Sequence, residues 1–488
     1  MTLMKSLLLG SAATFVVVAG AQAADLPTKK GAPAAEYVRV CKIGDIAGFV
    51  IPGTDTCLKI GGLITAQTTF GSTADQYVIR TPVTAVAYVP GTVAGVTPAV
   101  APVMPVAGVA RDRLAVAQYA KQRDQVGMYT RGRLALDAVS NTAYGPLLAH
   151  INIEENVGTG FDSAASYGTI DGAYLQWAGI TAGYHTSFFD FIGGGNAWDD
   201  LASPKFDPTQ QLAYTATFGG GFSATLSLEA PEPATIAGNA TALGAAEPLY
   251  GNLYNTGRLG LQSPDIVASL DVTQGWGSAK LAGVAHQVRQ YAGTLGTAVY
   301  ADTNTWGWGV IGGVSFNIPG LGAGADVKLQ GEYLDGALQY SHLFSLGSYN
   351  YSGVSYDGPL ADAYYNRLSG SWEKPIVWGA AAQVDLPLGP NFKVVPEAAY
   401  EHIHIGGTAG TGRVAGLDGF SSLSPNVNVW IGGGTLEWTP VKNLVFDLDL
   451  LYSDIHQDAP SGWTSTGVSA WKSTADGFNG KLRIERDF

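Results

Sequence analysis

The sequence predicts an all-β protein: a sixteen-stranded antiparallel transmembrane β-barrel with short periplasmic turns and long extracellular loops. Three observations predict this class. The 488 residues include 65 Gly, 17 Phe and 23 Tyr but only 4 Met, which favours strands and turns over helices. Apolar and polar side chains alternate with period two along most of the chain. The predicted connections are alternately long and short, as in an outer-membrane barrel.

The first 23 residues have the pattern of a cleaved export signal. Lys5 precedes an apolar run from Leu7 to Gly20, and Ala21-Gln22-Ala23 matches the small-x-small pattern of a signal peptidase site. The mature chain is therefore expected to begin near Ala24. No later stretch reaches the roughly 18 uninterrupted apolar residues that a spanning helix needs, so helical membrane spans are excluded.

The charge balance is acidic. The full chain has a net charge of −13, and removal of residues 1–23 takes away one positive charge, Lys5, which leaves −14. Binding to a nucleic-acid backbone needs clustered Lys and Arg, so this balance argues against a nucleic-acid partner.

Residues 24–57 are predicted to form a periplasmic N-terminal segment. Cys41 and Cys57 are the two cysteines of an exported chain, and we interpret them as one disulfide. On the chain-entropy model such a loop stabilises by roughly 3 kcal/mol, and it holds the segment close to the first strand. A metal site is the alternative, but no further Cys or spaced His pair lies nearby.

Residues 58–488 are predicted to form the barrel. In "DVKLQGEYLD" (326–335) the charged and amide side chains share one face and the apolar ones share the other, and "LVFDLDLLY" (444–452) has the same pattern. Sixteen such strands are expected, at 58–70, 128–138, 146–155, 170–178, 180–187, 210–218, 222–230, 264–273, 277–289, 305–317, 324–335, 368–386, 391–403, 427–439, 443–455 and 476–488.

The connections distinguish the two ends of the barrel. Long ones follow the odd-numbered strands, and short ones with turn residues, such as "NTAYG", "GWG" and "GLGAG", follow the even-numbered strands. Long extracellular loops and short periplasmic turns are typical of outer-membrane barrels.

The strands of a soluble β-sandwich would also alternate apolar and polar residues. The choice between a sandwich and a membrane barrel therefore depends on whether the apolar faces pack together or contact lipid. Charges lie in the middle of most polar faces, as in a water-filled lumen. Aromatic residues lie near strand ends, as in the interfacial girdles of a barrel: Phe70, Tyr129, Trp177, Tyr184, Trp306, Trp308, Trp438 and Tyr452. Because hydrocarbon cannot satisfy an unpaired sheet edge, the sheet must close.

Several segments resemble, in order, the porins of alphaproteobacteria, such as those of rhizobia. They are "EYVRVCKIGDIAGFVIPGTDTCLKIGG" (36–62), "TRGRLALDAVSNTAYGPLLAHI" (130–151), "AYLQWAGITAGYHTSFFDF" (173–191), "QLAYTATFGGGFSATLSLE" (211–229) and the ending "GKLRIERDF". Between about 231 and 475 the match is weaker. The resemblance implies a trimeric barrel of the bacterial outer membrane, in contact with lipid and lipopolysaccharide, through which small hydrophilic solutes diffuse. The Pro/Ala/Val-rich tract at 79–113 does not match the family and is expected to be irregular or extended.

The resemblance also implies that the loop after the fifth strand narrows the pore. This loop, at 187–208, contains Asp190, Asp199, Asp200 and Asp207 against one cation, Lys205. The inward faces of the first three strands have Lys59, Arg131, Arg133 and His150. Acids facing bases across a gap would create a transverse field that acts on dipolar solutes. The alternative is an ordinary surface loop in which the acids cap turns.

Other motifs favour no further site. "GTAGTGR" (407–413) lacks the Lys-Ser/Thr ending of a phosphate-binding loop. His402 and His404 form a potential metal pair without an evident third ligand, and Asp447 with Asp449 fits lumen lining as well as cation binding. We therefore predict neither a cofactor nor a metal.

The leading interpretation is a passive channel that is not an enzyme and has a mild cation preference because of its excess of acids. A solute-specific channel for a sugar or an anion is the second interpretation. A barrel lipase would need a nucleophilic Ser and a His on its outer wall, and a secreted soluble β protein would stay in solution without detergent.

The chain ends within its last predicted strand, "GKLRIERDF" (480–488). Alternation places Leu482, Ile484 and Phe488 on the lipid face. Pairing of this strand with the first would remove both sheet edges. A terminal aromatic also resembles the signal that the barrel-insertion machinery recognises during assembly. Arg486 falls on the lipid side, which requires the strand end to lie in the headgroup zone.

Overall fold

The computed structural model describes residues 39–71, 126–160, 167–192, 209–231, 262–290, 303–342, 371–404, 426–458 and 474–488, with short pieces between them. The predicted export signal, residues 1–23, lies outside the described residues.

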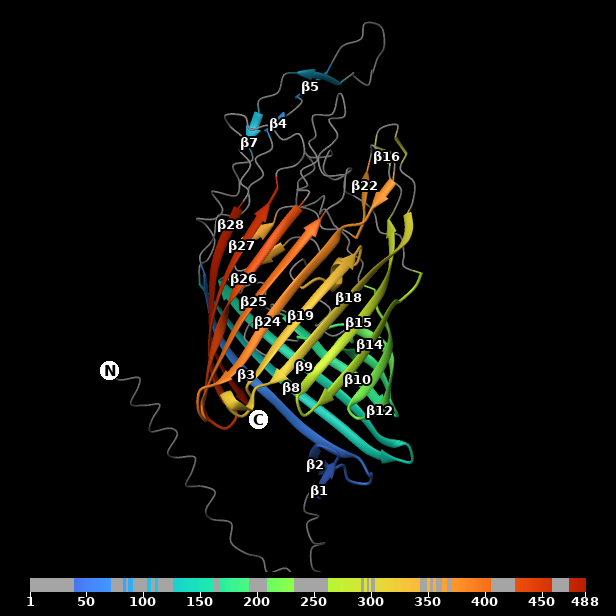
Figure 1. The fold of residues 1–488 in the computed structure, drawn as a ribbon, viewed down its shortest axis with the longest axis vertical. Coiled ribbons are helices and arrows are strands. Elements are labelled where there is room, and N and C mark those ends of the chain that lie inside the picture. Colours follow the sequence, from blue (N-terminus) through green and yellow to red (C-terminus); the bar gives the residue numbers. More distant parts are fainter. Residues whose placement is uncertain are drawn as a thin grey trace, which may run out of the picture.

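The described part of the chain forms a closed antiparallel barrel of sixteen strands (Figure 1). The first eight are β3 (Cys57–Gly71), β8 (Val126–Thr142), β9 (Gly145–Gly160), β10 (Tyr167–Trp177), β11 (Ile180–His185), β12 (Thr209–Gly219), β13 (Phe222–Glu229) and β14 (Asp265–Gln274). The other eight are β15 (Gly277–Gln290), β18 (Thr303–Asn317), β19 (Asp326–Asp335), β24 (Ile376–Pro387), β25 (Phe392–His404), β26 (Asn426–Val441), β27 (Leu444–Gln457) and β28 (Thr474–Asp487).

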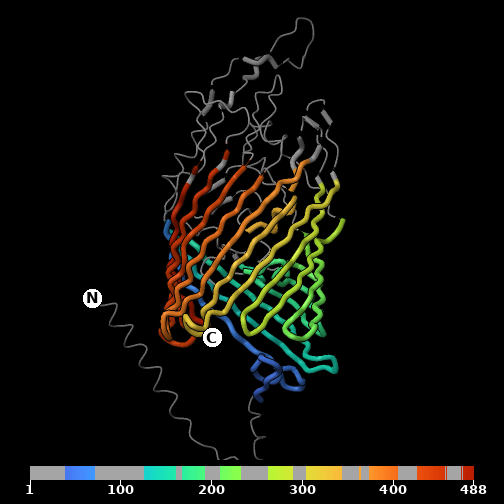
Figure 2. Tube along the Cα trace, in the orientation of Figure 1, coloured from blue at the N-terminus to red at the C-terminus, as the bar shows by residue number. Residues whose placement is uncertain are grey.

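Each barrel strand pairs with its neighbours in this order, and β28 pairs with β3 to close the cylinder. The strands run tilted around the barrel (Figure 2), as closure of a sheet requires. At the seam, Asp487 lies opposite Leu63, and the backbone of Phe488 exchanges two hydrogen bonds with Gly62, at 3.0 and 3.2 Å. The prediction that the last strand pairs with the first is confirmed.

A small hairpin extends the first strand below the barrel (Figure 1). It consists of β1 (Val40–Ile43) and β2 (Ile46–Val50), and β2 pairs with the start of β3. The expected disulfide joins Cys41 to Cys57, with Cα atoms 5.8 Å apart. This bridge fastens the hairpin to the first residue of β3.

Short turns join the strands at the end of the barrel that lies next to this hairpin. Residues 143–144, 178–179, 220–221, 275–276 and 442–443 are two-residue connections, and the turn after β18 contains a 3₁₀ helix, η4 (Pro319–Leu321). Asn443 adopts a φ of +62°, a left-handed conformation that Asn tolerates better than most residues. Nη1 of Arg486 donates to the carbonyls of Lys442 and Asn443 in this turn, so its charge lies at the strand end rather than at mid-membrane.

The exposure of the strands is the reverse of that in a soluble protein. Along β19, Leu329 and Tyr333 are 45% and 36% exposed, whereas Gln330 and Glu332 are 7% and 8% exposed. The same reversal recurs around the barrel, where large apolar side chains such as Leu226, Leu281 and Trp430 are exposed. An outer surface of this kind suits lipid, and the polar faces line the interior.

All sixteen predicted strands are present. Most of their ends differ from the expected ones by a few residues, and the largest error concerns the start of one strand. The strand expected at 368–386 begins at Ile376, because Pro375 has no N–H to donate to a ladder. Residues Ser371–Glu373 (β23) pair instead with Tyr364–Asn366 (β22).

The remaining described elements are short. The tract at 79–113 includes four extended pieces that pair two by two, β4 with β7 and β5 with β6, in agreement with the extended structure expected there. These four pieces are β4 (Pro82–Thr84), β5 (Ala87–Pro90), β6 (Val103–Val106) and β7 (Ala110–Asp112). Two further short pairs are β16 (Thr294–Leu295) with β17 (Ala298–Val299) and β20 (Tyr349–Tyr351) with β21 (Val354–Tyr356).

Among the described residues, no helix has the length and apolar character needed to cross a membrane.

Candidate pore and its inner wall

The inner face of β8, β9 and β10 has a cluster of ion pairs. Arg133 lies directly opposite Glu154 in the strand register, and its guanidinium lies 2.7 Å from that carboxylate and 2.6 Å from Asp171. Nε of Arg131 lies 3.1 Å from the same Glu154. One buried acid thus joins two arginines of the predicted basic wall.

Tyr129 belongs to this inner cluster rather than to the aromatic girdle, which corrects the sequence-based assignment. Nε of Arg131 donates to its hydroxyl at 2.6 Å, while its neighbour Met128 is 61% exposed on the outer face. The reason is alternation itself, since positions 129, 131 and 133 share one face of the strand.

Lys59 and His150 converge on one acid, Asp137, of the strand between them. Each lies opposite Asp137 in the register, with Nζ of Lys59 at 3.9 Å and Nδ1 of His150 at 2.6 Å from its carboxylate. The structure therefore brings the four predicted basic residues onto one wall, and it also brings acids of the same wall beside them.

The described part of the predicted constriction loop, residues 187–192, runs along the inner face of the opposite wall. The backbone N–H of Phe188 donates to Glu229 of β13 at 3.2 Å, and the N–H of Ile192 donates to Gln330 of β19 at 2.9 Å. Between them, Nζ of Lys280 on β15 donates to the carbonyls of Phe188 and Asp190 at 3.2 and 2.8 Å. The loop begins inside the barrel.

Glycine makes room for this loop at one point on the wall. The ring of Phe191 occupies the space that a Cβ atom of Gly313 on β18 would need. Any larger residue at position 313 would therefore push the loop away from the strand.

A second segment, residues 336–342, also folds into the barrel, and the sequence did not predict it. It follows β19 and contains the 3₁₀ helix η5 (Leu338–Tyr340), whose residues are all buried. The ring of Tyr340 packs edge-on against Phe189 at 5.0 Å, so the two inward segments contact each other. Its hydroxyl donates to Asp265 of β14 at 2.9 Å.

Asp265 belongs to a buried network that holds this segment to the wall. His286 of β15 lies between two carboxylates, with Nδ1 at 2.7 Å from Asp265 and Nε2 at 3.2 Å from Asp362. Asp362 in turn accepts the N–H of Leu338 at 2.8 Å, and Gln339 donates to Asp265 at 2.6 Å.

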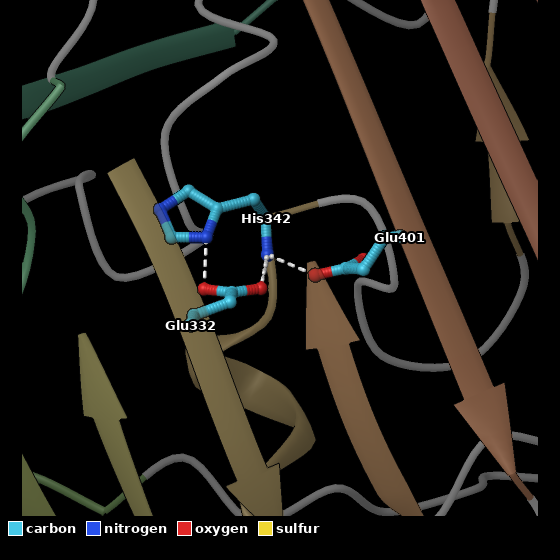
Figure 3. A group of neighbouring side chains, drawn as sticks. All are labelled: Glu332, His342 and Glu401. Carbon is cyan, nitrogen blue, oxygen red and sulfur yellow. Dashed lines mark hydrogen bonds and ion pairs between the residues drawn. The ribbon is translucent and has the colours of Figure 1, made fainter. Parts of the chain in front are cut away.

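His342, at the end of the second segment, faces three acids. Its ring contacts Glu332 through Nδ1 (Figure 3). Nε2 of the same ring lies 3.4 Å from Asp190. Its backbone N–H donates to Glu332 and Glu401, at 3.3 and 3.2 Å. Burial alone would lower the pKa of His342, but the carboxylates of Glu332 and Asp190 raise that pKa well above its usual value.

Asp190 is the member of the predicted acidic set that the structure describes. It is only 7% exposed, and its carboxylate faces His342. Asp199, Asp200 and Asp207 lie outside the described residues. Sequence reasoning missed His342, Glu332 and Glu401, and an apolar run directly after a strand, "ALQY", was the available signal.

A row of rings connects the basic wall with the constriction loop. His150 stacks on Tyr174 with ring centres 4.7 Å apart, Tyr174 contacts His185 at 4.5 Å, and His185 stacks on Phe188 at 5.9 Å. The row crosses β9, β10 and β11 and ends on the loop.

The residues that the sequence left as potential metal or cation ligands contact residues of neighbouring strands. Asp447 accepts from Arg483 at 2.8 Å, as expected of lumen lining. His402 and His404 alternate with buried residues on β25, and they contact Asn428 and Asn426 of the next strand at 2.8 and 2.7 Å. The two histidines therefore belong to the outer face, and His402 lies next to Trp378.

Comparison with known proteins gives consistent matches. Residues 25–480 match the model of a family described as "Porin subfamily". The porin Omp2b of Brucella suis biovar 1 is 28% identical over 412 residues, which cover 81% of this chain and 92% of that protein, and Omp2b of Brucella abortus strain 2308 has the same values. The outer membrane channel DcaP of Acinetobacter baumannii has the same fold, with a TM-score of 0.57, 15% identity and coverage of 91% of this chain and 100% of that chain.

Proposed function

We propose, on the premise that this chain belongs to the Porin subfamily, that its barrel is a water-filled channel for passive diffusion of small hydrophilic solutes and ions. As a member of that family, the chain is an outer-membrane protein and a channel rather than an enzyme. The finer claims, which concern what passes and with what selectivity, rest on the inner wall.

The observation that carries the proposal is the polar, ion-paired inner wall. Arg133 with Glu154, Lys328 with Asp385 and Lys393 with Glu437 each have a shortest separation of 2.7 Å. Such a wall offers hydrogen bonds to a hydrophilic solute as it passes. An apolar solute loses its contacts with water there and makes no hydrogen bonds in return.

The constriction belongs to the loop at 187–208. Support comes from its described start, which is bonded to the inner faces of β13, β15 and β19. The carboxylate of Asp190 faces His342, so any cation preference of the loop rests on Asp199, Asp200 and Asp207. The excess of acidic residues in the whole chain favours a mild preference for cations. Added salt weakens this preference, because at physiological ionic strength dissolved ions screen charges over about 8 Å.

Planar-bilayer recordings of the purified protein test this function. Wild type should give open-channel conductance and a reversal potential that favours cations in a salt gradient. The double variant D199N/D200N should keep the barrel and move the reversal potential toward zero. Unchanged selectivity and conductance would remove this part of the loop from the constriction, and absence of conductance would contradict the channel itself.

A solute-specific channel is the second candidate, and the row of rings from His150 to Phe188 favours it. Stacked rings give a sliding solute with apolar faces, such as a sugar, successive contacts along the wall. A sugar that binds there should reduce the ion current, and this block should saturate as the sugar concentration rises. Y174A should weaken the block. Sugars without effect on wild-type current would leave general diffusion as the function.

The assembly partners follow from the family as proposals. We expect a homotrimer that contacts outer-membrane lipid and lipopolysaccharide and that needs the barrel-insertion machinery for assembly. Sedimentation of the detergent-solubilised protein measures the number of chains directly, and a monomeric mass would contradict the trimer.

A further inference from the structure

We propose that Glu332, His342 and Glu401 form a binding site for one divalent metal ion of the zinc type, which fastens the segment 336–342 to the barrel wall. The three residues come from three elements, because Glu332 lies on β19, Glu401 lies on β25 and His342 ends the inward segment (Figure 3).

The side chains have the spacing that one ion requires. One potential ligand atom from each residue lies within 4.8 Å of the other two. Neighbouring ligands of a tetrahedral zinc ion, each at about 2.0–2.2 Å from it, lie about 3.5 Å apart, so rotations of the three side chains could bring their ligand atoms onto one ion.

The charges of the cluster also call for a cation. Glu332, Glu401 and His342 are 8%, 1% and 9% exposed, so two carboxylates share a site with almost no access to water. Two buried carboxylates cannot both ionise at such close range without a positive partner. His342, whose Nδ1 contacts Oε2 of Glu332, supplies one positive charge when its ring is protonated. A divalent ion that displaces this proton and separates the two atoms would supply two.

The surroundings match the usual second layer of a metal site. If Nδ1 of His342 binds the ion, Nε2 faces Asp190 at 3.4 Å, and it makes no hydrogen bond at present. Ligating histidines usually donate their other ring N–H to a carboxylate, which fixes the ring. Ser341 also donates to Glu401 at 2.9 Å, which orients the second carboxylate.

The cluster has room for an ion. A cavity of about 10 Å³ is lined by Glu332, His342 and Glu401 together with Tyr400 and Gln330. This volume is close to that of one water-sized sphere. One imidazole and two carboxylates favour zinc and similar first-row ions over calcium or magnesium, which prefer oxygen ligands alone, and a water completes four ligands.

Zinc titration of the purified, detergent-solubilised protein tests the site, with binding followed by calorimetry and bound metal measured by mass spectrometry after dialysis. Wild type should bind one zinc per chain. E332Q and H342A should each lower the affinity by about tenfold or more, and D190N should lower it by about tenfold, because removal of the outer partners of a metal site typically costs that much.

Two matched controls separate this site from adventitious zinc. H402A removes a histidine of the outer face of β25, and E437Q removes a lumenal acid paired with Lys393 at 2.7 Å, so neither should change zinc binding. Retarded migration of the unheated protein on a gel verifies that each variant forms a barrel, and E332Q nearly preserves the shape of the side chain. The proposal is overturned if wild type does not bind one zinc ion per chain, or if E332Q and H342A bind zinc as tightly as wild type. The cluster would then be a carboxyl pair that shares a proton.

Discussion

At the scale of single residues, Glu154 is the acid that pairs with both arginines of the basic wall. It is 3% exposed and forms ion pairs with both Arg131 and Arg133. We expect E154Q to shift the channel toward anions, since it leaves one more net positive charge on the wall. A unit charge about 8 Å from an ion in water changes its energy by about 0.5 kcal/mol, or about twofold in partitioning. The measurement is the reversal potential in a salt gradient.

E154D is the matched control, because it keeps the charge and shortens the side chain by one methylene. Its reversal potential should stay near that of wild type. The arginines are 31% and 24% exposed, so the lost pairs cost E154Q only about 1 kcal/mol of stability. Equal reversal potentials for E154Q and wild type would place Glu154 away from the ion path.

The sequence predicted the faces of these residues but not their partners. Alternation alone places Lys59, Arg131, Arg133 and His150 on the inner side of their strands. Which acid lies opposite each base depends on strand register, as in the pair Arg133 and Glu154 or the pair Lys59 and Asp137. Register is fixed by turns and by the whole sheet. A two-residue shift keeps every side chain on its face, so alternation does not detect it, yet it would have exchanged every partner.

At the scale of elements, Tyr340 connects the two inward segments. Its ring contacts Phe189 and its hydroxyl donates to Asp265. We expect Y340A to cost about 3 to 5 kcal/mol of local packing, as for other buried aromatic residues. The strand ladders on either side remain, so the loss should appear as faster backbone hydrogen exchange in 187–192 and 336–342, with a larger and noisier conductance.

Y333A is the control for that experiment, since Tyr333 lies on the neighbouring strand but faces outward and is 36% exposed. It should leave exchange in both segments unchanged. Slow exchange in Y340A, equal to that of wild type, would mean that the segments are held by the His286 and His342 networks without the tyrosine.

Sequence reasoning did better on strands than on these segments for a physical reason. A membrane strand must present one apolar face, so period two is present in every one of the sixteen and places nearly all boundaries within a few residues. The segment 336–342 has no such period, and its contacts include Asp265 and Glu401, which lie 75 and 59 residues away in the chain from the residues that they contact. Its burial therefore depends on side chains that only the closed barrel brings together.

At the scale of the whole molecule, the seam between β28 and β3 decides whether a barrel exists. A sheet in lipid with one open edge leaves a row of unpaired N–H and C=O groups in hydrocarbon. The last residue completes the seam: Phe488 exchanges two backbone hydrogen bonds with Gly62. Its ring lies over that glycine, where an added Cβ atom would be 2.7 Å from Cζ of the ring.

Deletion of Phe488 should therefore lower the yield of assembled protein without changing the conductance of the channels that do form. The deletion removes the final hydrogen bonds of the seam but no side chain of the ion-paired wall. F488A, which keeps the backbone, separates the two roles of the residue: it should assemble well if the bonds matter most and poorly if the exposed ring is the assembly signal. F478A removes an outward ring from the other end of the same strand and should assemble normally. The measurement is the amount of heat-modifiable protein in outer-membrane fractions, and a wild-type yield from the deletion would show that closure does not need the terminal residue.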